Sequence, residues 1–160
     1  MIVVADSGPI HYLILIAAID ILHPLYDSVI VPQTVSEELN SGDAPEAVRV
    51  WMEHAPDWFQ IQPDPVSDPV VNETLDPGER AAIALALSIA ADRLLIDDWE
   101  GRVEAERRHL KITGTLGVLA EAHKRSLLDF ESTLARLSLT NFYFSADLVD
   151  KLRRRLAAQS

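Results

Sequence analysis

The chain has 160 residues, 48% of them hydrophobic, which is enough for one sizeable core and gives no reason to expect two. It contains no cysteine, so disulfides, thiolate zinc sites and cysteine nucleophiles are excluded. The start lacks the basic segment of a signal peptide, and no apolar run is long enough to cross a bilayer. We therefore expect a soluble cytoplasmic protein with no membrane partner.

The net charge of −11 argues at first against nucleic acid as a partner, because polyanions are drawn to positive surfaces. The charge is uneven, however. Residues 1–100 carry 18 acidic and 3 basic side chains (net −15), and residues 101–160 carry 7 acidic and 11 basic side chains (net +4). The basic side chains of the second part are either solvated helix faces or a surface that binds nucleic acid. The candidates for binding are Arg102, Arg107, Arg108 and Lys111.

The first third of the chain predicts strands that are each followed by a helix. A β-branched run over residues 2–5 predicts a buried strand that ends on Asp6 and a turn. Residues 10–22 are apolar nearly all round, which predicts a buried helix or two packed helical pieces. A second strand over 29–31 stops at Pro32, and Thr34 is the expected N-cap of a helix that carries Glu38.

The middle of the chain predicts a second set of elements. Residues 45–54 fit an amphipathic helix, 58–62 alternate as an edge strand does, and 63–69 fit a loop. Residues 76–79 open a helix that continues through the alanine-rich stretch 80–91. Asp76 is its expected N-cap, and Pro77 stands at its first position. Glu79 stands three residues after Asp76, at the spacing of a capping box.

The remainder continues the alternation of strands and helices. Residues 94–96 predict a strand that ends on Asp97 and Asp98, and a charged surface helix over 99–109 follows. Residues 111–113 predict a last core strand, residues 116–124 a helix, and two or three helical segments follow, the last capped by Ser145. Because parallel neighbours need crossover connections, this order predicts a three-layer α/β/α sandwich with a central parallel sheet.

Acidic residues recur where the strands end. Asp6, Asp97 and Asp98 follow strands directly, and Glu38 and Glu79 come from early helical turns at the same edge. Carboxylates held a few ångströms apart cannot all stay ionised unless a cation lies among them. Carboxylate oxygens suit Mg²⁺ or Mn²⁺, whose bound water can attack a phosphodiester. No Walker lysine loop, GxGxxG, HExxH or GxSxG motif offers a competing chemistry.

Each of these acids also has a purely structural interpretation. Asp76 and Glu79 fit a helix cap, Glu38 a solvated helix position, and Asp97 and Asp98 the cap of the next helix. Asp6 is harder to explain this way, because a strand buried in the core is a costly place for an unpaired charge. The five histidines show no ligand spacing, and we expect the three tryptophans to pack, with base stacking by Trp99 as the alternative.

In order along roughly the first 128 residues, several motifs resemble those of the PIN-domain superfamily, which includes the VapC-type toxins and small prokaryotic proteins predicted to bind nucleic acid. The motifs are Val4-Ala5-Asp6-Ser7-Gly8-Pro9-Ile10, Val29-Ile30-Val31-Pro32 through Val35 to Glu38-Leu39, Asp76-Pro77-Gly78-Glu79 with its alanine-rich helix, Leu95-Ile96-Asp97-Asp98, and Ile112-Thr113-Gly114-Thr115-Leu116-Gly117-Val118-Leu119.

The resemblance implies a Mg²⁺- or Mn²⁺-dependent endoribonuclease, often neutralised by a cognate antitoxin. The acids of the family fall on Asp6, Glu38, Glu79 and Asp98, with Asp97 as the alternative to Asp98, and the metal ligands on Asp6, Glu79 and Asp98. Ser7 and Thr115 would support metal or phosphate through hydrogen bonds. Residues 1–128 would then be the nuclease domain, and 129–160 a basic helical extension packed on it. We interpret the apolar segment Leu13–Ala18 as a homodimer or antitoxin surface.

Three alternatives to a toxin-like ribonuclease stay open. The same metal site would cleave DNA if the binding surface selected it, as in a structure-selective DNA nuclease. A receiver-like signalling domain would place its acidic pair after the first strand, whereas here the pair comes late. A degenerate PIN domain that only binds a partner would not need the full set of acids that this chain carries.

Overall fold

A computed structural model of the chain describes residues 1–66 and 74–159. Within them, five strands form one parallel sheet in the order β3-β2-β1-β4-β5. The strands are β1 (Val3–Ala5), β2 (Val29–Pro32), β3 (Phe59–Gln62), β4 (Arg93–Leu95) and β5 (Ile112–Thr113). The central strand β1 lies between β2, where Val4 pairs with Ile30, and β4, where Val3 pairs with Arg93. The expected strands are confirmed, and β3 is an edge strand as its sequence predicts.

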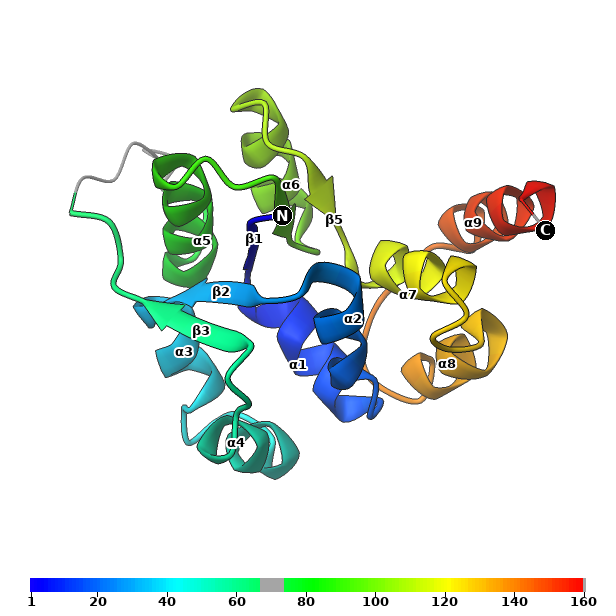
Figure 1. The fold of residues 1–160 in the computed structure, drawn as a ribbon, viewed down its shortest axis with the longest axis horizontal. Helices are drawn as coiled ribbons and strands as arrows, with labels where there is room; N and C mark the ends of the chain where they lie inside the picture. Colours follow the sequence, from blue (N-terminus) through cyan, green and yellow to red (C-terminus); the bar gives the residue numbers. More distant parts are fainter. Residues whose placement is uncertain (67–73, 160) are drawn as a thin grey trace.

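Helices cover both faces of this sheet, which confirms the three-layer architecture. They are α1 (Ser7–Leu15), the 3-10 turn η1 (Ile19–Ile21), α2 (Leu22–Tyr26), α3 (Gln33–Leu39), α4 (Glu46–Glu53), α5 (Pro77–Ser88), α6 (Trp99–Arg107), α7 (Thr115–Lys124), α8 (Phe130–Leu137) and α9 (Ala146–Ala158). Right-handed crossovers in this strand order place α1 to α4 on one face and α5 and α6 on the other, as Figure 1 shows.

The small residues of α5 explain how its N-terminus reaches the edge of the sheet. Ala82, Ile83 and Ala86 are fully buried, and the helix packs against β1, β2 and β4. Short side chains allow a helix axis to approach the strands closely. Because a crossover helix runs antiparallel to its strands, the first turn of α5 lies where the strands end.

One helix start differs from the expectation. The helix α3 begins at Gln33 with Pro32 as its N-cap, so the expected cap by Thr34 is wrong. A partner distant in sequence supplies the missing acceptor instead. The backbone N–H of Thr34 donates to Asp64 Oδ1 at 3.1 Å, and its hydroxyl donates to the other carboxylate oxygen. Of the loop expected over 63–69, residues 67–69 lie outside the described part of the chain.

The apolar segment Leu13–Ala18 belongs to the core of this chain. Leu13, Ile14, Ile16 and Ala18 are all buried within it. The interpretation of this segment as a dimer or antitoxin surface is therefore wrong, because four of its six side chains already pack inside the molecule. The apolar stretch from residue 10 to 22 is divided among α1, η1 and the start of α2, so it is not one continuous helix and has one piece more than the two that were the alternative.

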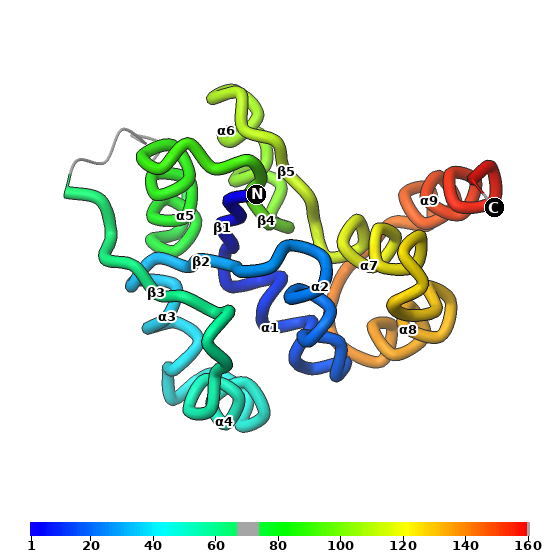
Figure 2. Tube along the Cα trace, in the orientation of Figure 1, coloured from blue at the N-terminus to red at the C-terminus, as the bar shows by residue number. Residues whose placement is uncertain are grey.

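The last two helices pack on α7. Both α8 and α9 contact it, and Figure 2 shows them together at the end of the molecule away from α4 and α5. Ser145 caps α9 as expected, since its hydroxyl accepts the N–H of Leu148 at 3.1 Å. The division of the chain at residue 128 stays a prediction.

Candidate active site

The acidic side chains meet where β1 and β4 end. These strands are neighbours, but the crossovers that follow them leave in opposite directions, so the topological switch point of the sheet, where open α/β proteins bind ligands, lies between them. The N–H of Asp6 donates to Leu95 O at 2.9 Å, so the residue that follows β1 is fixed beside the end of β4. Asp97 and Asp98 follow β4 almost at once. The sequence-predicted acids therefore lie at one edge of the sheet.

Asp6 is the most enclosed of these acids. Its side chain is only 5% exposed, and within the described residues no hydrogen-bond donor reaches Oδ1. The pKa of Asp6 is raised to about 7, chiefly by burial; the nearby charges of Asp76, Glu38 and Asp97 add to this rise, and the Ser7 N–H opposes it. A buried carboxylate oxygen without a donor, near other carboxylates, lacks the positive partner that would stabilise it.

Glu38 is held in place by two donors from other elements. The side chain of Ser7 and the backbone N–H of Gly78 donate to its carboxylate and lower its pKa, although burial has the larger effect and the net shift is upward. A Cβ at position 78 would overlap this carboxylate, so only glycine permits the contact. The start of α1, the end of α3 and the start of α5 are therefore joined through one carboxylate.

Glu79 and Asp76 form a pair at the start of α5. Asp76 Oδ1 accepts the N–H of Glu79 at 2.8 Å, which confirms the expected helix cap. Glu79 is only 7% exposed, and burial raises the pKa of its carboxyl to about 9. The charge of Asp76, a hydrogen bond between the two carboxyl groups, and the charges of Asp98 and Asp6 act in the same direction. At neutral pH Glu79 thus keeps its proton unless a cation takes its place.

Asp97 and Asp98 differ in their surroundings. Asp97 accepts the N–H of Thr115 at 2.7 Å and its hydroxyl at 2.6 Å. Burial raises the pKa of Asp97, whereas these bonds and the Arg102 guanidinium lower it. Asp98 is exposed and is the N-cap residue of α6, yet its side chain makes no capping bond. Asp97 is thus fixed by its partners, while the negative charge of Asp98 acts on the carboxyl group of Glu79.

A family model described as PIN domain matches residues 2–158 of this chain. The chain belongs to the PIN-domain family. Its fold is similar to that of a solved PilT N-terminus domain protein from the hyperthermophilic archaeon Sulfolobus solfataricus P2, with a TM-score of 0.54 and 13% identity. That likeness covers 91% of this chain and 100% of the other. No curated protein matches the chain. Among the described helices, none has both the length and the apolar character needed to cross a bilayer.

PIN domains are generally nucleases that use divalent metals. The acidic cluster of this chain has the chemistry that such a metal requires of its ligands. The possible ligands are all carboxylates, Asp6 has an enclosed oxygen that no hydrogen-bond donor reaches within the described residues, and several carboxyl pKa values are raised, which together fit a hard divalent cation. In the described part of the chain, no three acidic or histidine side chains already stand close enough to hold one ion. Binding therefore requires side chains of the cluster to reorient.

Asp76 is the member of the cluster that sequence reasoning did not assign to the site. Its role as the N-cap of α5 is a sufficient local reason for an aspartate at this position, yet the charge of Asp76 raises the pKa values of Asp6, Glu38 and Glu79. The signal that could have found it is its position. The side chains at the N-cap and at the third helical residue lie at the same helix end, so a site that includes Glu79 also includes Asp76.

The basic candidates separate into two groups in the PIN domain. Arg102 lies beside Asp97 at the site. Arg107 and Arg108 extend from the far end of α6 and bind Glu104 at 3.0 and 3.3 Å, and Lys111 is exposed just before β5. Trp51 and Trp58 pack with Phe59 as expected, whereas Trp99 is 75% exposed at the start of α6, so the expectation that it packs is wrong.

Proposed function

We propose that this PIN domain is an endoribonuclease that hydrolyses RNA phosphodiesters and requires Mg²⁺ or Mn²⁺. The observation that carries the proposal is the enclosed Oδ1 of Asp6, which no hydrogen-bond donor reaches in the described residues and which lies near the carboxyl groups of Asp76, Glu38 and Asp97. Such an arrangement is unfavourable for the fold alone, and a bound cation would offset it.

Asp6, Glu79 and Asp98 are the residues that would hold the ion, with Glu38 and Asp97 beside them. When bound, a divalent ion supplies positive charge for the scissile phosphate and lowers the pKa of a water to the range of a nucleophile. Asp98 and Asp97 are not equivalent in this proposal, since Thr115 already occupies both oxygens of Asp97. Asp98, which makes no capping bond, is free to act as a ligand.

The chain's own residues prepare this edge in three ways. Ser7 and Gly78 orient Glu38, and Thr115 and Arg102 hold Asp97, so these carboxylates of the cluster are fixed from several elements. Burial keeps the carboxyl groups of Asp6 and Glu79 protonated up to pKa values of about 7 and 9. Loading with a cation must displace these protons. Cleavage should therefore increase as pH rises from 6 to 8.

The test is cleavage of end-labelled single-stranded RNA and DNA of one sequence with Mg²⁺, Mn²⁺ or EDTA, alongside the Asp6→Asn variant. We expect metal-dependent cleavage of RNA that the variant loses by a factor of about 100 or more, as for removal of a group that acts in the transition state. Cleavage in EDTA, or unchanged cleavage by Asp6→Asn, would refute the proposal. Cleavage of DNA alone would favour the structure-selective DNA nuclease.

A toxin-like role with a cognate antitoxin, a cytoplasmic location and a homodimer are parts of the same proposal that rest on the family alone. A toxin arrests growth when it is expressed without its partner, so expression of the wild-type chain beside Asp6→Asn tests that role. Growth that is equally slow with both would argue against catalysis as the cause. Sedimentation equilibrium at several concentrations tests the dimer.

A further inference from the structure

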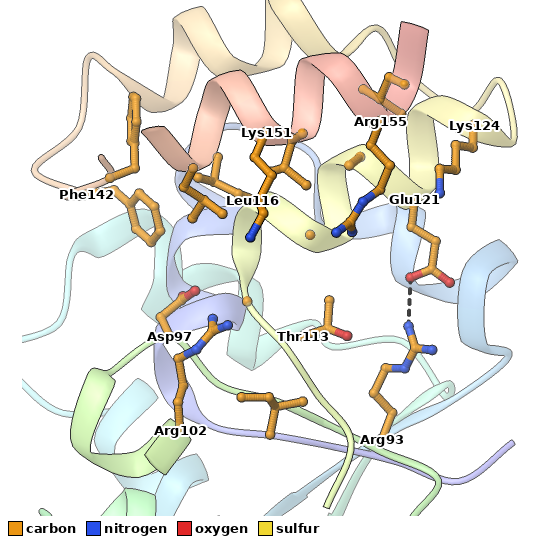
Figure 3. Close-up of a pocket in the computed structure, with 18 of the residues that line it drawn as sticks. Arg93, Asp97, Arg102, Thr113, Leu116, Glu121, Lys124, Phe142, Lys151 and Arg155 are labelled. Atoms are coloured by element: carbon orange, nitrogen blue, oxygen red, sulfur yellow. Dashed lines mark hydrogen bonds and ion pairs between the residues drawn. The ribbon is translucent and has the colours of Figure 1, made fainter. Parts of the chain in front are cut away.

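A cavity of about 740 Å³ lies between α7, β5 and α9, beside the acidic cluster. Asp97 and Arg102 stand at one end of it, and Lys124 stands at the other, as Figure 3 shows. Because Asp97 belongs both to this cavity and to the cluster around Asp6, the cavity leads directly to the proposed cleavage site. It therefore lies where the chain of a substrate would extend from the scissile bond.

The cavity is strongly positive in a chain that is strongly negative. Six cationic side chains line it against two carboxylates, Asp97 and Glu121, which gives a net charge of +4. The chain as a whole carries −11, so the remainder carries −15. The six are Arg93, Arg102, Lys124, Arg125, Lys151 and Arg155. A cleft that is lined by charges of one sign and has low-dielectric walls concentrates the electric field and attracts ions of the opposite charge, which here are anions.

Both carboxylates in the cavity already have partners. Glu121 binds Arg93 at 2.9 Å and accepts the hydroxyl of Tyr26 at 2.8 Å, and Asp97 accepts both donors of Thr115. Their repulsion toward an incoming phosphate is thereby reduced. With Glu121 paired to Arg93, two cations of α9 remain that face the cavity.

Lys151 and Arg155 are these cations. They stand four residues apart, hence on one face of α9, and Figure 3 shows both reaching down into the cavity. In the described chain neither forms an ion pair. Arg153 between them points elsewhere and binds Glu131 at 2.6 Å. Two cations about one helical turn apart, with no ion pair among the described residues, are suited to successive phosphates of a chain that lies in the cavity.

An exposed aromatic ring completes this surface. Phe142 and Phe144 pack partly into the core, with Phe142 edge-on to Tyr12, whereas Tyr143 between them is 87% exposed and lines the cavity. An exposed ring beside a cationic groove suits a base that has left its stack, and a paired base cannot reach it. The combination therefore favours a single strand over a duplex.

We propose that single-stranded RNA binds in this groove, with phosphates on Lys151 and Arg155 and a base stacked on Tyr143. The choice of RNA over DNA as the bound strand rests on the proposed endoribonuclease function. It assigns to the C-terminal helix α9 the selection of an unpaired strand and its delivery to the acidic cluster. The groove, and not the far end of α6 with Arg107 and Arg108, is then the main binding surface.

The test measures binding in EDTA, so that it does not depend on cleavage. A fluorescein-labelled uridine 12-mer is titrated by anisotropy with wild type, with Lys151→Gln/Arg155→Gln, and with Arg154→Glu. Arg154 is exposed and lies outside the groove, and its substitution changes the net charge by the same two units. We expect the double variant to bind at least about tenfold more weakly and its salt slope to fall by about 1.4, since each phosphate contact on a single strand contributes about 0.7.

Tyr143→Ala should weaken binding at least about fivefold while Tyr143→Phe does not, because stacking needs the ring and not the hydroxyl. The same RNA annealed to its complement should bind more weakly than the free strand. Equal loss in Arg154→Glu and the groove variant, or equal binding of the duplex, would overturn the proposal. Binding of polyglutamate in place of RNA, lost in the groove variant, would overturn it in favour of an acidic protein partner. RNA binding that follows this pattern without cleavage in any metal would leave the groove standing and refute the nuclease.

Discussion

Asp6→Asn should make the metal-free protein more stable at the same time as it removes cleavage. The carboxyl group of Asp6 has an ordinary pKa of 3.8 and a folded-state pKa of about 7 because it is buried among other acids. Between these values the folded state binds more protons than the unfolded state, so the folding free energy becomes less favourable as pH rises. Over the full interval the ionised carboxylate costs about 4 kcal/mol, at about 1.4 kcal/mol for each pKa unit.

This cost is absent below pH 4, where the group is protonated in both states, and complete above pH 7, where it is ionised in both. Asparagine has the shape of the protonated acid and does not ionise, so the variant should be about 2–4 kcal/mol more stable than wild type at pH 8, since mutational effects scatter around the linkage value. At pH 4 the two should be nearly equal. Added Mg²⁺ should stabilise wild type and not the variant.

Urea unfolding followed by circular dichroism at pH 4, 6 and 8 in EDTA measures this difference, with Asp57→Asn as an exposed control of the same chemistry. Wild-type stability that is flat between pH 4 and 8, or a variant that gains nothing at pH 8, would refute the reasoning. In either case the carboxyl of Asp6 would not carry the electrostatic strain that motivates the metal site.

Three further substitutions separate the roles of neighbouring residues. Gly78→Ala places a Cβ against the carboxylate of Glu38, which can be pushed aside because it ends a flexible side chain, so cleavage should fall at least about tenfold while urea stability changes by less than about 1 kcal/mol. A larger loss of stability would mean that the helix and not the carboxylate is displaced. Thr115→Val removes the hydroxyl that donates to Asp97 and leaves that carboxylate oxygen without its donor, so the free energy of unfolding should fall by about 1–3 kcal/mol. Thr115→Ser, which keeps the hydroxyl, should recover most of this loss. Trp99→Ala should leave thermal stability nearly unchanged, because the ring is 75% exposed, and any rise in KM on RNA without a fall in kcat would identify a contact with the substrate; unchanged kinetics would exclude one.

The sheet and most of its acids could be predicted because they follow local rules. Short β-branched runs that end on Asp6 and on Asp97 identify buried strands, and parallel sheets collect functional groups beyond their carboxyl ends. No such rule gives the start of α3, because the acceptor for Thr34 comes from Asp64, thirty residues away. For the same reason the sequence shows that Asp76 caps a helix and not which carboxylates that helix end meets.

The groove was the least predictable part. Helical spacing places Lys151 and Arg155 on one face of α9, but only the packing of α9 on α7 decides what that face meets. The sequence shows a positive C-terminal third, and the early candidates on α6 were the nearest cations to the acidic pair. Trp99 illustrates the same limit. Its size predicts that it packs, but it is exposed because the helix that carries it begins at the surface, which the sequence does not show.

The position of β1 at the centre of the sheet bears on how the protein is made. Its neighbour β2 is close in sequence, whereas its other neighbour pairs Val3 with Arg93, a separation of 90 residues. During synthesis, the segment that carries Asp6 must wait for β4 to leave the ribosome before half of its hydrogen-bond partners exist. The groove needs α9, which comes later still. A nascent chain that lacks β4 and α9 therefore carries acids that are not yet gathered at one edge of the sheet, with no groove beside them.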